Sequence, residues 1–111
     1  MPRDYKVYLD DILQAIEKVR EYTAGFSPAE LAGDAKTFDA VIRNLEVIGE
    51  AAKAIPEVIR LKHPQVDWKR IAGLRDILIR QYSGVDAQII WDIIQNKLSA
   101  LEEQIRAMVK S

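Results

Sequence analysis

Apolar residues recur every three or four positions along most of the chain, which is the spacing of amphipathic helices. The pattern predicts three long helices, over residues 5–23, 38–55 and 86–109. A fourth helix is expected to begin near Asp67, whose carboxylate can cap it, and to bury an apolar stripe that ends at Leu78. No segment shows the alternation of apolar and polar residues that indicates a β-strand.

Proline, glycine and capping residues divide the chain between these runs. Gly25 is expected to end the first helix, and Ser27-Pro28-Ala29-Glu30 has the residues of a reciprocal cap for a short helix. Another short helix can begin at Pro56 and end before His63-Pro64. Because the connections are short, we predict an all-α fold: a compact antiparallel bundle of four main helices plus short helices, forming one domain over residues 1–111.

The composition excludes several classes of site and partner. The 111 residues are 49% apolar and 30% charged, and their net charge is −1. No general basic field therefore draws the chain to DNA or to a membrane, and any RNA contact must come from a local cluster or from a groove between two subunits. With no cysteine and one histidine, we expect neither a metal nor another cofactor. The N-terminus lacks the apolar run of a signal peptide, so a cytoplasmic location is expected.

One stretch, residues 74–86, places strong polar groups inside an otherwise apolar pattern. Arg75 and Tyr82 lie seven residues apart and would share a helix face within about 20°, whereas Arg80 lies about 140° from Arg75. Two arginines and a tyrosine near a helix end could clamp a phosphate, and the phenol could stack on a base or act as a nucleophile. The structural alternative is that Asp76 forms a simple ion pair with Arg75.

Other polar residues have a weaker claim to function. Glu46 and Glu50 are four residues apart on one helix face, where paired carboxylates can serve acid–base chemistry or bind a metal. More often such a pair lies on a solvated face or meets arginines across a contact with another helix. His63 precedes a proline in a polar loop and has no partner at a fixed spacing, so it is interpreted as an exposed loop histidine.

Several blocks of the sequence, in order along nearly the whole chain, resemble the HepT-like branch of the HEPN superfamily, whose helical domains are associated with minimal nucleotidyltransferases. The matching blocks are residues 8–12 (Tyr-Leu-Asp-Asp-Ile), 43–51 (Arg-Asn-Leu-Glu-Val-Ile-Gly-Glu-Ala), 66–76 (Val-Asp-Trp-Lys-Arg-Ile-Ala-Gly-Leu-Arg-Asp), Tyr82, 84–86 (Gly-Val-Asp) and Trp91.

The resemblance implies a HEPN-like fold and a homodimeric toxin of a bacterial or archaeal toxin–antitoxin pair. It also implies metal-independent RNA cleavage by an arginine, an adjacent polar residue and a histidine four to six residues further on. In that scheme the histidine transfers a proton at the ribose 2′-hydroxyl, and the arginine stabilises the transition state. By position, Arg75 matches the arginine and Asp76 the polar residue. Tyr82 matches the tyrosine that the nucleotidyltransferase antitoxin can modify with AMP in relatives.

The chain departs from the family pattern at Arg80, which stands where relatives have the catalytic histidine. A guanidinium stays protonated, with a pKa above about 12, and cannot act as a general base near neutral pH. The loss of a general acid–base group costs about 10²–10⁴ in rate. RNA cleavage is therefore expected to be impaired or absent, either because this is a natural degenerate member or because a substitution has inactivated the toxin.

Two other interpretations stay open. The chain can be a non-catalytic binding partner of a minimal nucleotidyltransferase that accepts an AMP group at Tyr82, or a structural helical dimer without RNA function. Dimerisation is predicted because apolar residues occur on more than one side of the last two helices, namely Ile77, Ile79, Ile89, Trp91 and Ile93.

Overall fold

The computed structural model describes residues 4–80 and 87–110, and it describes Arg75, Ile77, Ile79 and Arg80 by their backbone alone. Helices make up nearly all of this part: α1 (Tyr5–Thr23), α2 (Pro28–Gly33), α3 (Ala35–Ala54), α4 (Glu57–Lys62), α5 (Trp68–Arg80), α6 (Ala87–Asn96) and α7 (Leu98–Lys110). These two ranges contain no strand, so the predicted all-α fold is confirmed.

The predicted caps set where the first helices end and begin. Gly25 follows α1 with a φ of 79°, the left-handed conformation that glycine adopts without steric cost. Ser27 and Glu30 form the predicted reciprocal cap, with bonds of 3.1 Å from the Glu30 amide to the serine hydroxyl and 3.0 Å from the Ser27 amide to the carboxylate. Asp34 caps α3 by accepting the Thr37 amide at 3.1 Å, and this bond lowers the pKa of the Asp34 carboxyl.

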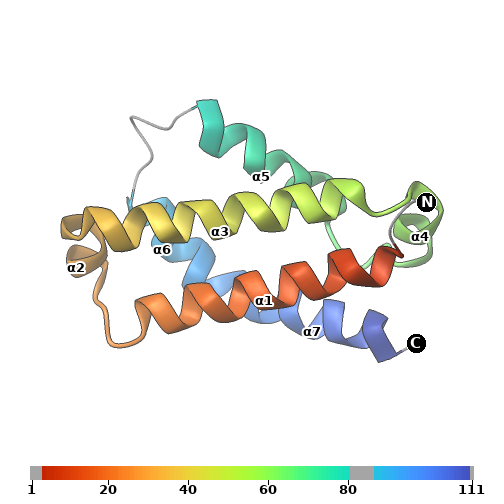
Figure 1. Cartoon of the computed structure of the whole chain (residues 1–111), viewed down its shortest axis with the longest axis horizontal. Helices are drawn as coiled ribbons and strands as arrows, with labels where there is room; N and C mark the ends of the chain where they lie inside the picture. Colours follow the sequence, from red (N-terminus) through yellow and green to blue (C-terminus); the bar gives the residue numbers. More distant parts are fainter. Residues whose placement is uncertain (1–3, 81–86, 111) are drawn as a thin grey trace.

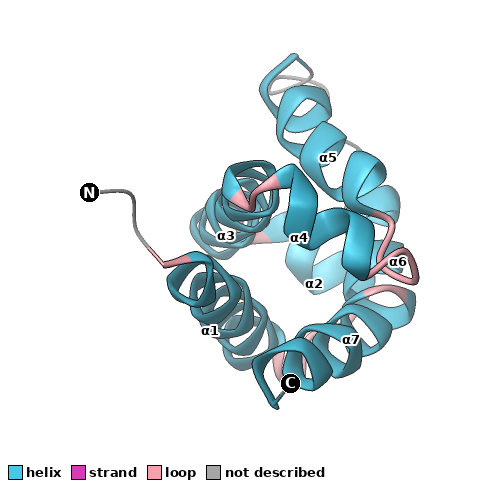
Figure 2. Ribbon diagram, turned by 90° about the vertical axis from the view of Figure 1, so that its right-hand side faces the viewer, coloured by secondary structure: helices cyan, strands magenta, loops and turns pink. Residues whose placement is uncertain are grey.

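Helix α3 lies between α1 and α5, as both views of the molecule show (Figures 1 and 2). On the other side of α1 lies α7, while the short helix α2 contacts both α3 and α6. The largest fully buried side chains come mainly from α1, α3 and α7: Leu9, Ile12, Ile16, Val19, Leu45, Ile48, Ile105 and Met108. The hydrophobic core therefore runs along these three helices, and burial of their apolar stripes is the main term that stabilises the fold.

The single helix predicted over residues 86–109 is wrong in one detail, because the structure has two helices that meet at Lys97. Asp86 itself lies outside the described residues. The helical bonds continue across the junction, from the Lys97 amide to the Ile93 carbonyl at 3.0 Å and from the Leu101 amide to the Lys97 carbonyl at 3.2 Å. The axis changes there because α6 packs against α2, whereas α7 packs against α1.

Helix α5 forms an outer edge of the molecule, and its C-terminal end diverges from α3 (Figure 1). Trp68 near its start and Leu78 near its end are buried, whereas Ile71 and Leu74 between them are only partly covered. The helix thus keeps apolar surface that the rest of the described chain does not cover. In the described ranges, no helix has the length and apolar character needed to cross a bilayer.

Candidate functional site around α5

The start of α5 is fixed by hydrogen bonds from three directions. Asp67 caps the helix as predicted, since its carboxylate accepts the Arg70 amide at 3.3 Å. The indole N–H of Trp68 donates to the His63 carbonyl at 3.0 Å and ties α5 to the end of α4. From α7, the Gln104 amide nitrogen donates to the Gln65 carbonyl at 3.0 Å. These bonds set the position of α5, and with it the register of the residues further along the helix.

Helix α5 carries three of the four predicted site residues along a little more than one turn of its second half. Arg75 and Arg80 both lie within the helix, but their side chains are outside the described part of the structure. Asp76 is exposed. Tyr82 lies outside the described residues, as does the Gly84–Asp86 segment. The structure therefore confirms that Arg75, Asp76 and Arg80 share one helix.

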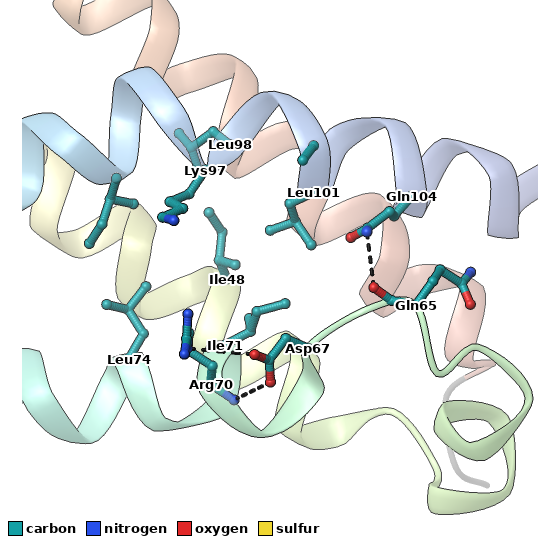
Figure 3. A pocket seen from close by; sticks show the side chains of 12 residues that line it. Ile48, Gln65, Asp67, Arg70, Ile71, Leu74, Lys97, Leu98, Leu101 and Gln104 are labelled. Carbon is teal, nitrogen blue, oxygen red and sulfur yellow. Dashed lines mark hydrogen bonds and ion pairs between the residues drawn. The ribbon is translucent and has the colours of Figure 1, made fainter.

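One flank of α5 forms a groove with α3 and α7, here called the α5–α7 groove (Figure 3). It has a volume of about 280 Å³. Its surface is mostly apolar, and the lining residues are Ile48, Gln65, Asp67, Arg70, Ile71, Leu74, Ile93, Lys97, Leu98, Ala100, Leu101 and Gln104. Leu74, the residue immediately before Arg75, marks the end of the groove along α5.

The opposite flank of α5 borders a larger and more polar hollow against α4, here called the α4–α5 hollow, with a volume of about 990 Å³. Asp76 lines it, together with three cationic side chains, Lys53, Arg60 and Lys69. Two further carboxylates, Glu57 and Asp67, also line it and balance these charges. Among the described residues, the Arg60 Nε is buried without a hydrogen-bond partner. Asp76 and Leu74 therefore face two different spaces on either side of the same helix.

The other polar candidates from the sequence have structural roles. His63 is partly buried rather than exposed as predicted, and its backbone amide ends α4 by donating to the Arg60 carbonyl at 3.0 Å. Glu46 is partly buried and pairs at 3.7 Å with Arg43 of its own helix, rather than with an arginine across a helix contact as predicted. Glu50 is exposed. Within residues 4–80 and 87–110, no three His, Asp or Glu side chains gather closely enough to hold a metal ion.

A second polar cluster lies away from α5 and joins α1 to α7. Glu102 accepts a hydrogen bond from the Arg20 guanidinium at 2.6 Å and another from Arg106 at 3.3 Å. Arg20 also donates to the Ser99 hydroxyl at 3.2 Å. The hydrogen bond from Arg20 is the main reason that the pKa of the Glu102 carboxyl is lowered. This cluster joins α1 to α7 and involves no residue of α5.

Sequence reasoning missed the groove, because it treated residues 86–109 as one continuous helix. A signal for its position was present: Lys97 lies four residues after Ile93 and four before Leu101, so it shares a face with two apolar residues. Gln104 and Arg70 could not have been found in this way. Their positions on the same groove depend on how α5 and α7 pack.

Comparison with known proteins gives consistent results along nearly the whole chain. Residues 12–108 match the family described as Ribonuclease HepT-like. A protein of Methanocaldococcus jannaschii named as a candidate RNase is 44% identical over 111 residues, which is 99% of this chain and 92% of that protein. A protein of Thermococcus cleftensis named as a candidate ribonuclease HepT is 39% identical over 110 residues, which is 99% of this chain and 100% of that protein.

A third relative, from Caldanaerobacter subterraneus and also named as a candidate RNase, is 42% identical over 103 residues. The aligned region covers 93% of this chain and 92% of that protein. No solved structure matches the chain.

Proposed function

Because the chain belongs to the HepT-like ribonuclease family, we propose that it is the toxin of a toxin–antitoxin pair and acts on RNA in a groove between two copies of itself. The observation that carries this proposal is the match over residues 12–108, with relatives named as ribonucleases that align over nearly their full length. The cognate partner would be a minimal nucleotidyltransferase antitoxin, and the place of action the cytoplasm. No metal takes part in the proposed cleavage.

The reacting groups of this function belong to the second half of α5. We assign to Arg75 the stabilisation of negative charge on the phosphorus centre in the transition state. Asp76 is the residue after Arg75; it is exposed, and we assign to it the role of the adjacent polar group. Arg80 stands at the position of the proton-transferring histidine and cannot replace it, because a guanidinium stays charged near neutral pH. Arg80 would instead add a forked donor for phosphate, so the chain would bind RNA better than it cuts it.

The proposal is tested by comparing RNA cleavage by the chain and by its Arg80→His variant, in the presence of a chelator. We expect the variant to cleave faster by about 10²–10⁴, because it regains a group that titrates near neutral pH. Arg106→His, on an exposed arginine of α7, is the matched control and should leave cleavage unchanged. Robust and equal cleavage by the chain and by Arg80→His would overturn the role given to Arg80. Negligible cleavage by both would contradict the ribonuclease function.

Assembly from two copies is a separate part of the proposal. Exposed apolar surface on α6 supports it: Ile89 is 58% exposed and Trp91 is partly exposed. Burial of such side chains at a subunit interface is favourable, because it removes apolar surface from water. Sedimentation at micromolar concentration should show twice the mass of the chain. A single species of 12.6 kDa would contradict a dimer.

A second candidate function follows from the combination of Arg80 with a retained Tyr82. In this alternative the chain is a non-catalytic binding partner of the minimal nucleotidyltransferase and accepts its AMP group on the Tyr82 phenol. The test is to incubate the chain with the transferase encoded beside it and ATP, and then to measure the protein mass. An unchanged mass, or a mass gain that persists in Tyr82→Phe, would exclude this function.

A further inference from the structure

We propose that the α5–α7 groove holds one unstacked base of a single-stranded RNA, with the neighbouring phosphates on Arg70 and Lys97. This inference rests on the proposed function, because it names where the RNA is held beside the cleavage segment. It adds a base-binding site to the residues Arg75, Asp76, Arg80 and Tyr82 that the sequence indicates.

The shape and lining of the groove suit a flat ring. Its volume of about 280 Å³ is at the lower limit of small-molecule pockets, which begin at roughly 300 Å³. Figure 3 shows Ile48 between the two walls, with Ile71 on the α5 side and Leu101 on the α7 side. Aliphatic side chains on both walls can cover the two faces of a base, which removes those faces from water without any need for an aromatic partner. RNA is read most often in single-stranded segments, where such a base can leave the stack.

Two cations border the groove on opposite walls. Figure 3 shows Arg70 on α5 and Lys97 at the junction of α6 and α7, and both line the space. Arg70 pairs with Asp67 at 3.5 Å, but the two side chains are 81% and 62% exposed. An ion pair this exposed contributes little to stability, so its guanidinium can turn to a phosphate at small cost. Arg70 and Lys97 thus outnumber Asp67, the one carboxylate of the lining, and can contact the two phosphates that flank a bound base.

The groove also contains a polar group that is held in place. Gln104 lines the groove, and its amide nitrogen is fixed by the bond to the Gln65 carbonyl. This bond orients the side-chain amide, whose oxygen is an acceptor for a donor on the edge of a base. A mostly apolar pocket with one oriented polar group is typical of sites that bind small rings.

The position of the groove along α5 connects it to cleavage. Arg70, Ile71 and Leu74 lie along its α5 wall, and Arg75 is the next residue. A strand with one base in the groove would therefore pass its next phosphate along the second half of α5. The groove would fix which phosphodiester reaches Arg75, and base binding would act as the positioning step.

A second copy of the chain fits this groove less well than RNA does. In a two-fold symmetric contact, the same surface patch meets itself. If the groove lay on the two-fold axis, it would face its own copy and leave a void, and Arg70 and Lys97 would lie near the same cations of the other copy. The α6 surface around Ile89 exposes a large apolar side chain and is the surface that we assign to the dimer.

The test blocks the groove without removing core side chains. Ala100 is exposed and lines the groove, so Ala100→Trp places a ring in the space proposed for the base. Ala107→Trp is the matched control, because Ala107 is an exposed alanine of the same helix that does not line the groove. Binding is measured by fluorescence anisotropy with a labelled oligouridine and with an abasic strand of the same length and charge.

We expect the unmodified chain and Ala107→Trp to bind oligouridine about tenfold more tightly than the abasic strand. Only oligouridine has a base that the groove can bury. Ala100→Trp should bind both strands alike, at the level of the abasic strand. Lys97→Gln, a second and milder variant, should weaken the binding of both strands. It should also reduce the salt dependence of the binding constant by about one released counterion.

Equal oligouridine affinity for Ala100→Trp and Ala107→Trp would overturn the base site while leaving the proposed function intact. So would a change in sedimentation mass for Ala100→Trp without a change in RNA binding, because the groove would then be a protein interface. If the unmodified chain bound neither strand, the proposed RNA function would fail, and the base site with it.

Discussion

The frame formed by α1, α3 and α7 and the outer helix α5 use similar amphipathic sequences in different ways. In α1, four successive apolar positions of the stripe are completely buried: Leu9, Ile12, Ile16 and Val19. In the described part of α5, Ile71 and Leu74 are at comparable positions of the stripe but are only partly covered. The difference shows that the frame uses its apolar residues for stability, whereas α5 keeps some of them available for a ligand or a partner.

The ion pair of the frame is also less exposed to solvent than the ion pair of α5. Arg20 and Glu102 join two helices that are far apart in the sequence, at 2.6 Å and with the carboxylate largely covered. Arg70 and Asp67 lie within one turn of α5, at 3.5 Å and largely in solvent. The first pair holds a helix contact in place, and the second can open when a phosphate arrives.

The largest expected stability difference between the regions comes from truncating one isoleucine in each. Ile16→Ala should lower the free energy of unfolding by about 2–5 kcal/mol, because it leaves a cavity in a closed core. Ile71→Ala should cost less than about half of this, because the side chain already borders an open groove. Urea denaturation of the two variants measures both values. Equal losses would show that the α5 flank is as tightly packed as the frame.

Removal of the α5 cap should have a moderate effect that is local to this helix. Asp67→Ala should cost about 1 kcal/mol, because the Arg70 amide loses its acceptor at the helix start. Amide hydrogen exchange should accelerate in α5 more than in α1, since the helix is held at its start and packs mainly on α3.

Asp39→Ala, on an exposed aspartate inside α3, is the control for the loss of a carboxylate and should change exchange little. If Asp67→Ala accelerated exchange equally in α1 and α5, the two regions would unfold as one unit, and the comparison between them would lose its basis.

The smallest expected effect concerns the pH dependence of the frame. The lowered pKa of Glu102 means that folding favours its charged form. Its contribution is complete above the usual value of about 4.5 and is lost as the pH falls below that value through the lowered pKa. Glu102→Gln should therefore cost under about 1 kcal/mol at neutral pH and reduce the loss of stability on acidification.

Thermal unfolding at several pH values checks this, with Glu103→Gln on the exposed neighbour as the control. A larger loss on acidification in Glu102→Gln than in the unmodified chain would contradict the sign of the pKa shift.

Local signals predicted much of the fold, and tertiary packing determined what they missed. The reciprocal cap at Ser27 and Glu30 and the cap at Asp67 need only residues close in sequence, and both predictions are confirmed. The break at Lys97 arises because α6 and α7 pack on different helices, which periodicity within one segment does not report. For the same reason the sequence did not predict the groove, whose lining residues, such as Ile48 and Leu101, are far apart in the sequence.

The candidate site, like the fold, was predicted from the sequence only where local signals determine it. The sequence indicated the polar residues of the 74–86 stretch because they interrupt an apolar pattern, and the structure places Arg75, Asp76 and Arg80 on one helix. It could not indicate that α5 separates an apolar groove from a polar hollow, because that depends on which neighbours cover each flank.

We propose that Arg80 is the residue that prevents the α5 site from cutting RNA. The most direct test is RNA cleavage by Arg80→His in two backgrounds, one with Arg75 retained and one carrying Arg75→Ala. We expect Arg80→His to cleave, and the double variant to lose most of that gain, by about 10²-fold or more, because the restored histidine needs the arginine that stabilises the transition state. Equal cleavage in both backgrounds would show that the gain does not come from the proposed site.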